Sequence, residues 1–273
     1  MNVVLPSHAM HSLPIKQVAT HSAELKSFLF EQTFEAEPGQ FVMLWIPGLD
    51  EKPFSVSDVR DGMIEITAKA VGPFSRALME CRPGERLGVR GPFGRGFRPR
   101  GRGLVVGGGM GIAPLRYLVH RLERDRASFR VALGARTAAE MMFVGDFSRV
   151  GAEFATDDGT LGRQSLVTGL VARLCAEEAF DVVYGCGPEP MLVALKKLAD
   201  ERGLDCQLSL ERHMKCGIGV CGSCCVDGSG ICICREGPVL DKAELDRVAD
   251  FGLPHRDAAG FRQKGSVRFR GRR

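Results

Sequence analysis

Three cysteines of this chain, Cys216, Cys221 and Cys224, follow the spacing C-x4-C-x2-C. Plant-type [2Fe–2S] sites use this loop spacing and take a fourth cysteine from later in the chain. The glycines between the three cysteines suit such a loop, because glycine tolerates positive φ and lets backbone N–H groups approach sulfur. A cluster of this kind moves one electron at a time, so the segment predicts an electron-transfer protein.

The remaining cysteines leave alternatives open. The N-terminus does not resemble a signal peptide, and cytosolic cysteines stay reduced, so we expect no disulfide and interpret Cys225 as a packed thiol beside the loop. A structural zinc site normally pairs two cysteine knuckles across a longer gap, and the single tight triplet therefore favours the cluster. The fourth ligand is either Cys232 or Cys234, which a strand would point to the same face.

Composition excludes several classes of protein. The chain has 273 residues, of which 44% are hydrophobic and 26% charged, with a net charge of only +4. This length suits two moderate domains and a small module. The charge balance argues against a dedicated nucleic-acid binder, and no apolar run reaches the length of a membrane span. We expect a cytoplasmic protein that binds neither nucleic acid nor membrane.

The pattern of elements changes near residue 100. Several short strand-like runs precede it and predict a small antiparallel barrel with one helix, Phe74–Cys81. Strands and helices alternate after Leu104, which indicates a parallel sheet covered on both faces. We therefore predict a β plus α/β fold. Its parts are a barrel domain (1–98), an α/β nucleotide-binding domain (101–207), a [2Fe–2S] module (208–240) and a basic tail (241–273).

Two glycine-rich turns follow strands of the predicted parallel sheet. The first, Gly107–Pro114, lies where a strand gives way to a helix, so its backbone N–H groups are placed to bind a pyrophosphate. It departs from the G-x-G-x-x-G fingerprint because Ile112 replaces the third glycine, and a turn for packing alone is the alternative. The second turn, Gly185–Pro188, follows the last parallel strand and should face the same crevice.

The order of barrel, glycine-loop domain and cysteine module resembles the ferredoxin–NAD(P) reductase superfamily. Within it, residues 12–260 resemble the electron-transfer subunits of NAD-dependent dihydroorotate dehydrogenases. Lys52-Pro53-Phe54-Ser55 matches the family's Arg-Pro-x-Ser flavin motif with Lys in place of Arg, which keeps the charge but loses the bidentate fork. Val71–Ser75 resembles the second flavin segment. The family's last cysteine precedes x-x-Gly-Pro-Val, a register that selects Cys234 over Cys232.

This resemblance implies the cofactors FAD, a [2Fe–2S] cluster and NAD as co-substrate. The cluster ligands would be Cys216, Cys221, Cys224 and Cys234. The residues that would bind FAD or NAD are Lys52, Pro53, Phe54, Ser55, Lys69, Gly72, Phe74, Ser75, Gly107, Gly108, Gly109, Gly111, Cys186 and Gly187. Ser55 would be the hydrogen-bond partner near flavin N5. No Ser/His/Asp triad or paired-carboxylate site is evident, so no side chain is assigned as catalytic.

The resemblance also implies a function within a complex. An FMN-containing catalytic dihydroorotate dehydrogenase subunit, in a heterotetramer of two plus two, would send electrons through the cluster and FAD to NAD in pyrimidine biosynthesis. The first alternative is the electron-transfer subunit of a sulfhydrogenase or of a ferredoxin–NADP reductase complex. The second is a zinc-stabilised regulatory module that binds a nucleotide. The choice between NAD and NADP stays open, because Arg136 could meet a 2′-phosphate or cap a loop.

Overall fold

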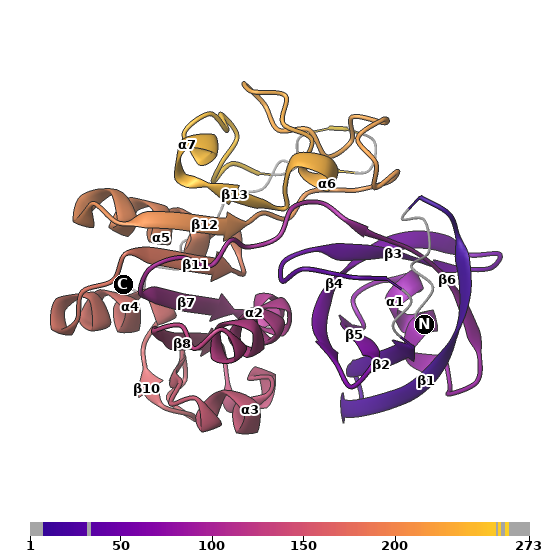
Figure 1. Ribbon diagram of the computed structural model, residues 1–273, viewed down its shortest axis with the longest axis horizontal. Coiled ribbons are helices and arrows are strands. Elements are labelled where there is room, and N and C mark those ends of the chain that lie inside the picture. Colours follow the sequence, from indigo (N-terminus) through magenta and orange to yellow (C-terminus); the bar gives the residue numbers. More distant parts are fainter. Residues whose placement is uncertain (1–7, 32–33, 255, 258–259, 262–273) are drawn as a thin grey trace.

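The computed structural model describes residues 8–31, 34–254, 256–257 and 260–261. Figure 1 shows a barrel beside an α/β sheet, with the segment that carries the last elements of the chain running along one side of both. Of the predicted basic tail (241–273), residues 255, 258–259 and 262–273 lie outside the described residues, and its first part contains a short helix, Lys242–Leu245. No helix in the described part is long and apolar enough to cross a membrane.

The first half of the chain forms a closed antiparallel barrel. Its strands follow the order β1-β2-β5-β4-β3-β6 around the barrel. They are β1 (His11–Ser22), β2 (Leu25–Glu31), β3 (Phe41–Ile46), β4 (Asp50–Arg60), β5 (Met63–Lys69) and β6 (Arg86–Phe93). Alternation along the strands places Phe28, Ile66 and Val56 in the apolar barrel core. Helix α1 (Pro73–Glu80) starts after β5, with a proline in its first turn.

The second half forms a sheet in the order β10-β9-β8-β7-β11-β12-β13, parallel except for its last strand. These strands are β7 (Gly103–Gly108), β8 (Phe129–Ala135), β9 (Glu153–Thr156), β10 (Arg163–Gln164), β11 (Val182–Cys186), β12 (Asp205–Ser209) and β13 (Val239–Asp241). The helices are α2 (Ile112–Arg124), α3 (Val144–Arg149), α4 (Val167–Glu177), α5 (Glu189–Arg202), α6 (Ile233–Glu236) and α7 (Lys242–Leu245); η1 (Gly109–Gly111) and η2 (Ala138–Glu140) are 3₁₀ turns. The buried strand β7 has no exposed residue, as expected for a parallel strand covered on both faces.

The cysteine segment between β12 and β13 packs against both halves of the molecule. Cys224 and Cys234 belong to one hydrophobic cluster with Phe41 and Phe93 of the barrel and with the side chains of α4 and α5. The predicted fold class is confirmed. The predicted domain limits remain predictions.

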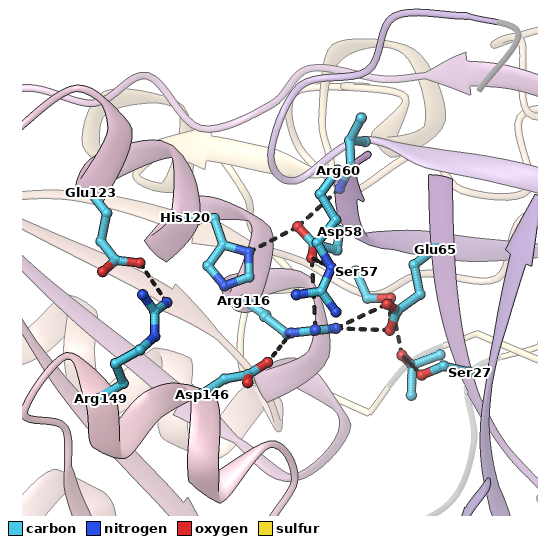
Figure 2. Close-up of polar contacts among 12 residues, drawn as sticks. Ser27, Ser57, Asp58, Arg60, Glu65, Arg116, His120, Glu123, Asp146 and Arg149 are labelled. Atoms are coloured by element: carbon cyan, nitrogen blue, oxygen red, sulfur yellow. Dashed lines mark hydrogen bonds and ion pairs between the residues drawn. The ribbon is translucent and has the colours of Figure 1, made fainter. Parts of the chain in front are cut away.

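A buried charged network joins α2 to the barrel (Figure 2). The Arg116 side chain of α2 is 5% exposed and donates from Nη1 to both carboxylate oxygens of Glu65 on β5, at 2.9 and 3.0 Å. Its Nε donates to Asp146 of α3 at 2.6 Å, and its Nη2 lies 3.7 Å from Asp58 of β4. His120 Nδ1, one turn further along α2, lies 2.9 Å from Asp58 Oδ1.

The Asp58 carboxylate makes this interface sensitive to acid. Burial alone would raise its pKa, but the hydrogen bond to His120 and the charges of Arg116 and Arg60 outweigh burial and lower the pKa below 3.8. The folded protein therefore binds this proton more weakly than the unfolded chain does. The stabilisation is fully present above pH 3.8 and is lost as the pH falls through the folded pKa.

We therefore expect Asp58→Asn to lower the free energy of unfolding at neutral pH by about 1–3 kcal/mol, the usual range for a buried hydrogen bond to a charged group. The difference between wild type and variant should shrink as the pH falls below 3.8. Urea denaturation of both proteins between neutral pH and pH 3 measures it. A difference that does not change with pH would contradict this role of the carboxylate.

Candidate cofactor sites

A cavity of about 440 Å³ opens between the barrel and the α/β sheet. Its lining comes from the barrel strands, from the two glycine-rich turns and from the chain on both sides of the cysteine loop. The lining residues are Phe41, Pro53, Phe54, Ser55, Thr67, Gly108, Met110, Gly111, Ala113, Pro114, Cys186, Gly187, Pro188, Ser209, Leu210, Glu211, Arg212, Met214 and Pro238. Three motifs that lie far apart in the sequence thus meet at one cavity.

The barrel wall contains part of the predicted flavin motif. Pro53, Phe54 and Ser55 of β4 line the cavity, and Thr67 of β5 adds a second hydroxyl. Lys52 does not line it, because its ammonium group pairs with Asp50 at 2.5 Å. Three of the four motif residues therefore line the cavity in this structure.

The second predicted flavin segment, Val71–Ser75, forms the start of helix α1. Gly72 is the residue before α1, and the Ser75 hydroxyl accepts hydrogen bonds from the backbone N–H groups of Val71 and Gly72, at 2.8 and 3.0 Å. Phe74 is buried in the barrel core, with its ring 5.8 Å from that of Phe54. These residues and Lys69 lie outside the cavity lining, although open space surrounds Gly72, where an added Cβ would meet no atom within 4 Å.

Some glycines of the loop Gly107–Gly111 allow close packing, and another leaves room for a ligand. A Cβ at Gly107 would lie 2.8 Å from the Leu133 side chain, so this glycine allows the loop to pack on the sheet. A Cβ at Gly111 would lie 2.3 Å from the backbone of Cys186, so only glycine lets the two turns approach each other. Gly108 and Gly111 line the cavity, whereas Gly109, with φ of +53°, faces open space as the first residue of η1, which leads into α2. This open helix start can accept an anionic group.

The second turn places Cys186 and Gly187 in the cavity wall. Burial raises the pKa of the Cys186 thiol to about 12, although a hydrogen bond with Ser209 acts in the opposite direction. Cys186 is therefore a neutral thiol at physiological pH.

The four cysteines predicted as cluster ligands lie close together, with the Cys216 thiol beside that of Cys221 and the Cys224 thiol beside that of Cys234. Cys234 N–H donates to the Cys224 sulfur at 3.3 Å, and Gly219 N–H donates to the Cys234 sulfur at 3.1 Å. The Cys216 sulfur accepts from the N–H groups of Ile218, Val220 and Cys221, at 3.5, 3.4 and 3.5 Å. Four thiols and a loop of inward N–H groups fit the donor set of a [2Fe–2S] cluster. In the described chain, no three His, Cys, Asp or Glu side chains close around a single-ion site.

The surroundings of Cys216 and Cys224 favour the thiolate, the form that binds iron. Partial burial opposes ionisation of Cys216, but the backbone N–H donors outweigh it and lower the pKa to about 6. A hydrogen bond with Cys234 is the largest cause that lowers the pKa of Cys224, to about 7, and it raises the pKa of Cys234. Gly217, Gly219 and Gly222 all have positive φ, as the wrapped loop requires.

The expectation of no disulfide is wrong in this structure. Cys225 and Cys232 form a disulfide and face each other across an antiparallel bridge, with their Cα atoms 4.1 Å apart. Cys225 is therefore not the packed free thiol that we expected. The physical reason is that the chain turns back between these residues, bringing Cys232 opposite Cys225, which spacing alone does not reveal. Cys232 is thereby occupied, and Cys234 is the cysteine that lies against Cys224.

Arg90 links the cysteine loop to the barrel. No motif in the sequence marks this residue as part of a site. Its Nη2 donates to the Cys216 carbonyl oxygen at 2.8 Å, while Nε and Nη2 donate to Glu51 at 2.6 and 2.8 Å. The Glu51 hydrogen bond is the largest cause of the raised pKa of Arg90. Glu51 precedes the flavin motif on β4, so one arginine links the cysteine loop to the strand that lines the cavity.

The cavity and the cysteine loop are neighbours. Met214 and Pro238 line the cavity and flank the loop in the sequence. On the other side, the ring of Phe41 lies in the cavity wall, 5.9 Å from the ring of Phe93. A Cβ on Gly217 would lie 3.4 Å from the Phe93 ring. The rings of Phe41 and Phe93 thus lie between the cavity and this part of the loop.

Sequence reasoning missed part of the lining. The segment Ser209–Arg212 begins at the last residue of β12, and Ser209 pairs with Cys186, so the rule that ligands bind at the carboxyl ends of parallel strands could have found it. Phe41 and Thr67 lie within barrel strands and carry no such signal.

Comparison with known proteins gives a consistent result. A family model described as the iron–sulfur cluster binding domain of dihydroorotate dehydrogenase B matches residues 211–246. A Methanocaldococcus jannaschii protein named as a probable dihydroorotate dehydrogenase B (NAD(+)) electron transfer subunit is 40% identical over 248 residues, covering 90% of this chain and 95% of that protein. The chain belongs to this family of electron-transfer subunits.

Other relatives agree in length and fold. A Methanothermobacter thermautotrophicus protein of the same name is 42% identical over 257 residues, covering 92% of this chain and 96% of that protein. The solved structure of an NADH-dependent reduced ferredoxin–NADP oxidoreductase superposes with a TM-score of 0.78 at 28% identity, covering 89% of this chain and 95% of that one. A Neisseria gonorrhoeae ferredoxin NADP+ reductase with bound FAD and NADP shares the fold, with a TM-score of 0.57 at 16% identity and coverage of 70% and 91%.

Proposed function

We propose that this chain is the electron-transfer subunit of a dihydroorotate dehydrogenase B, linking a catalytic partner to NAD in pyrimidine biosynthesis. The observation that carries the proposal is the shared cavity, whose lining combines the flavin motif, the nicotinamide-nucleotide loop and the residues that flank the cysteine loop. The identity of about 40% to subunits of this name supports this function over that of the ferredoxin–NADP oxidoreductase, which is 28% identical.

The residues present fit the cofactors that this function requires. FAD, when bound, exchanges electrons singly with an iron–sulfur cluster and in pairs, as hydride, with nicotinamide. Ser55 and Thr67 offer hydroxyl groups on the barrel wall, and the open start of α2 would hold the NAD pyrophosphate through its N–H groups. Cys216, Cys221, Cys224 and Cys234 would hold the cluster. The neutral Cys186 thiol places no negative charge beside the nicotinamide site.

The partner would dock over the cysteine loop. Cys221 is exposed, and its neighbours Ile218 and Val220 expose 37% and 79% of their surface. Exposed apolar side chains beside a redox centre suit a protein interface through which electrons enter. We propose an FMN-containing catalytic subunit as the partner, in an assembly of two copies of each chain, and a cytoplasmic location.

Replacing Cys221 tests whether the cluster is needed only for electrons from the partner and not for the exchange between FAD and NADH. We expect Cys221→Ser to lower NAD reduction by dihydroorotate in the reconstituted complex by about 100-fold or more, because electrons reach FAD only through the cluster. NADH oxidation by an artificial two-electron acceptor should stay within about twofold of wild type, because it needs only FAD and the nucleotide site. Cys175→Ser, on α4, is the matched control and should change neither rate. Loss of the second activity while FAD remains bound would contradict the modular arrangement.

A direct test of the function uses the two purified subunits. The complex should reduce NAD with dihydroorotate, and neither subunit alone should do so. Iron, acid-labile sulfide and FAD analysis distinguishes the zinc-stabilised regulatory module, which would contain zinc and lack the visible absorption of a flavin and cluster.

A further inference from the structure

The dimensions of the cavity depend on how α2 is seated on the barrel. Its α/β wall includes the glycine loop at the start of α2, and its barrel wall includes Ser55 of β4 and Thr67 of β5. These two walls belong to separate parts of the fold, so any shift of α2 across β4 and β5 changes the separation between them. The contacts between α2 and these strands therefore decide the geometry of the site.

Arg116 is the centre of those contacts. It follows Ala113 and Pro114, which line the cavity, within one turn of α2, and its guanidinium contacts acidic side chains from β4, β5 and α3 (Figure 2). The guanidinium carbon also stacks over the Phe143 ring at 4.5 Å. Arginine has a planar fork of donors, and binding partners on three elements at once restricts how the helix can slide or rotate.

Two further contacts from the same face of α2 restrict the movement of this helix in the same way. The Tyr117 hydroxyl donates to the Ala36 carbonyl oxygen at 2.6 Å, and His120 Nδ1 lies 2.9 Å from Asp58. Buried charge pairs are a weak source of net stability compared with apolar packing, and their best-attested use is to specify one arrangement over others. The ionic contacts of Arg116 are therefore better suited to fixing the position of α2 than to stabilising the fold.

A chain of hydrogen bonds continues from Arg116 to the cavity wall. Glu65, which pairs with Arg116, accepts from the Ser57 hydroxyl at 3.5 Å, and Ser57 accepts from the Thr67 hydroxyl at 3.0 Å. Ser57, Glu65 and Thr67 are all buried, and Thr67 lines the cavity. The network thus connects the helix that carries the nucleotide loop to the barrel wall opposite it.

We propose that Arg116 is a positioning residue for hydride transfer, holding the glycine loop at a fixed distance from β4 and β5. This inference rests on the proposed function. In the assay direction NADH loses a hydride, which is one proton with two electrons, and becomes NAD⁺, while the flavin gains that hydride. Arg116 touches neither group and acts through the placement of α2. Its effect should therefore fall on the rate of hydride transfer and not on nucleotide affinity.

The test compares Arg116→Met with Arg121→Met in the FAD-loaded protein. Arg121 is on the same helix, but its side chain is 39% exposed and pairs with Asp125 at the surface, so its replacement controls for loss of an arginine from α2. Anaerobic stopped-flow bleaching of the flavin at increasing NADH gives a limiting rate and an apparent Kd. We expect Arg116→Met to lower the limiting rate about 10- to 100-fold, as misplacement by about 1 Å does, with the apparent Kd within about threefold. Arg121→Met should match wild type.

Two more variants separate positioning from stability. Arg116→Met with Glu65→Gln removes both charges of the Arg116–Glu65 pair, while Asp58 keeps its partners His120 and Arg60, so the Tm should recover towards wild type while the limiting rate stays low. Arg116→Lys keeps the charge without the fork, and serves if Arg116→Met does not fold; its rate should also fall. In the cofactor-free protein, hydrogen exchange should increase in residues 103–124 and 50–69 for Arg116→Met and not for Arg121→Met.

The outcomes are distinct. A wild-type limiting rate in folded Arg116→Met or Arg116→Lys would overturn the inference, as would a double variant in which the rate recovers together with Tm. Failure of NADH to bleach the flavin in wild type would instead overturn the proposed function. The hydrogen-exchange comparison still tests in that case whether Arg116 holds the interface.

Discussion

Replacing Cys234 by serine is expected to abolish the iron–sulfur cluster, whereas replacing Cys232 should leave the cluster in place. The Cys234 sulfur is buried, accepts the Gly219 N–H at 3.1 Å and hydrogen bonds with Cys224. Serine at this position removes one of four thiolates, and a hydroxyl is a poor substitute because it does not ionise at neutral pH. Iron and acid-labile sulfide per chain should fall from two of each in wild type to about zero in Cys234→Ser.

Cys232→Ser is the matched control for this prediction, because it makes the same substitution two residues away. Its sulfur is bound to Cys225, so the variant should lose the disulfide, and some thermal stability with it, while iron and sulfide stay near wild-type values. Iron retained in Cys234→Ser and lost in Cys232→Ser would reverse the ligand assignment. Visible circular dichroism and the electron paramagnetic resonance of the reduced protein provide an independent measure of the cluster.

An aspartate at Gly109 is expected to weaken NADH binding far more than an asparagine at the same position. Gly109 has φ of +53° and open space around it, and it is the first residue of η1, which leads into α2. Asp and Asn both tolerate this left-handed backbone region and have nearly the same size, so the pair differs mainly in charge. Two unit charges about 5 Å apart, at an effective dielectric constant of about 20, repel by about 3 kcal/mol. The expected loss is therefore about 100-fold in affinity for Gly109→Asp relative to Gly109→Asn.

Titration with NADH, followed by anaerobic flavin bleaching, measures the two affinities. FAD and cluster content should be normal in both variants, because the groups proposed to hold them lie in the barrel and the cysteine loop. Equal affinity of the Asp and Asn variants would mean that the pyrophosphate does not lie at the start of α2. The loop would then be a packing turn, and the nucleotide would bind elsewhere.

The cysteine spacing and the glycine loops were recognisable without a structure because their physical requirements are local. A loop that wraps a cluster needs closely spaced thiols and glycines with positive φ, and all of these lie within one short segment. The change from short strands to alternating strands and helices likewise appears directly in the pattern of apolar residues. These features were sufficient to predict the fold class, which the structure confirms, and the kind of cofactors proposed here.

Contacts between distant segments were decided only by the tertiary structure. The pairing of Cys225 with Cys232 depends on how the chain turns back, and the separation of Lys52 from the cavity depends on its ion pair with Asp50. Glu65 and Arg116 lie 51 residues apart and look like ordinary surface charges until the barrel and α2 bury them together. Local pattern thus determined which elements form and which chemistry they can support. Packing determined which side chains share a site, because burial and pairing depend on neighbours that no short stretch of sequence contains.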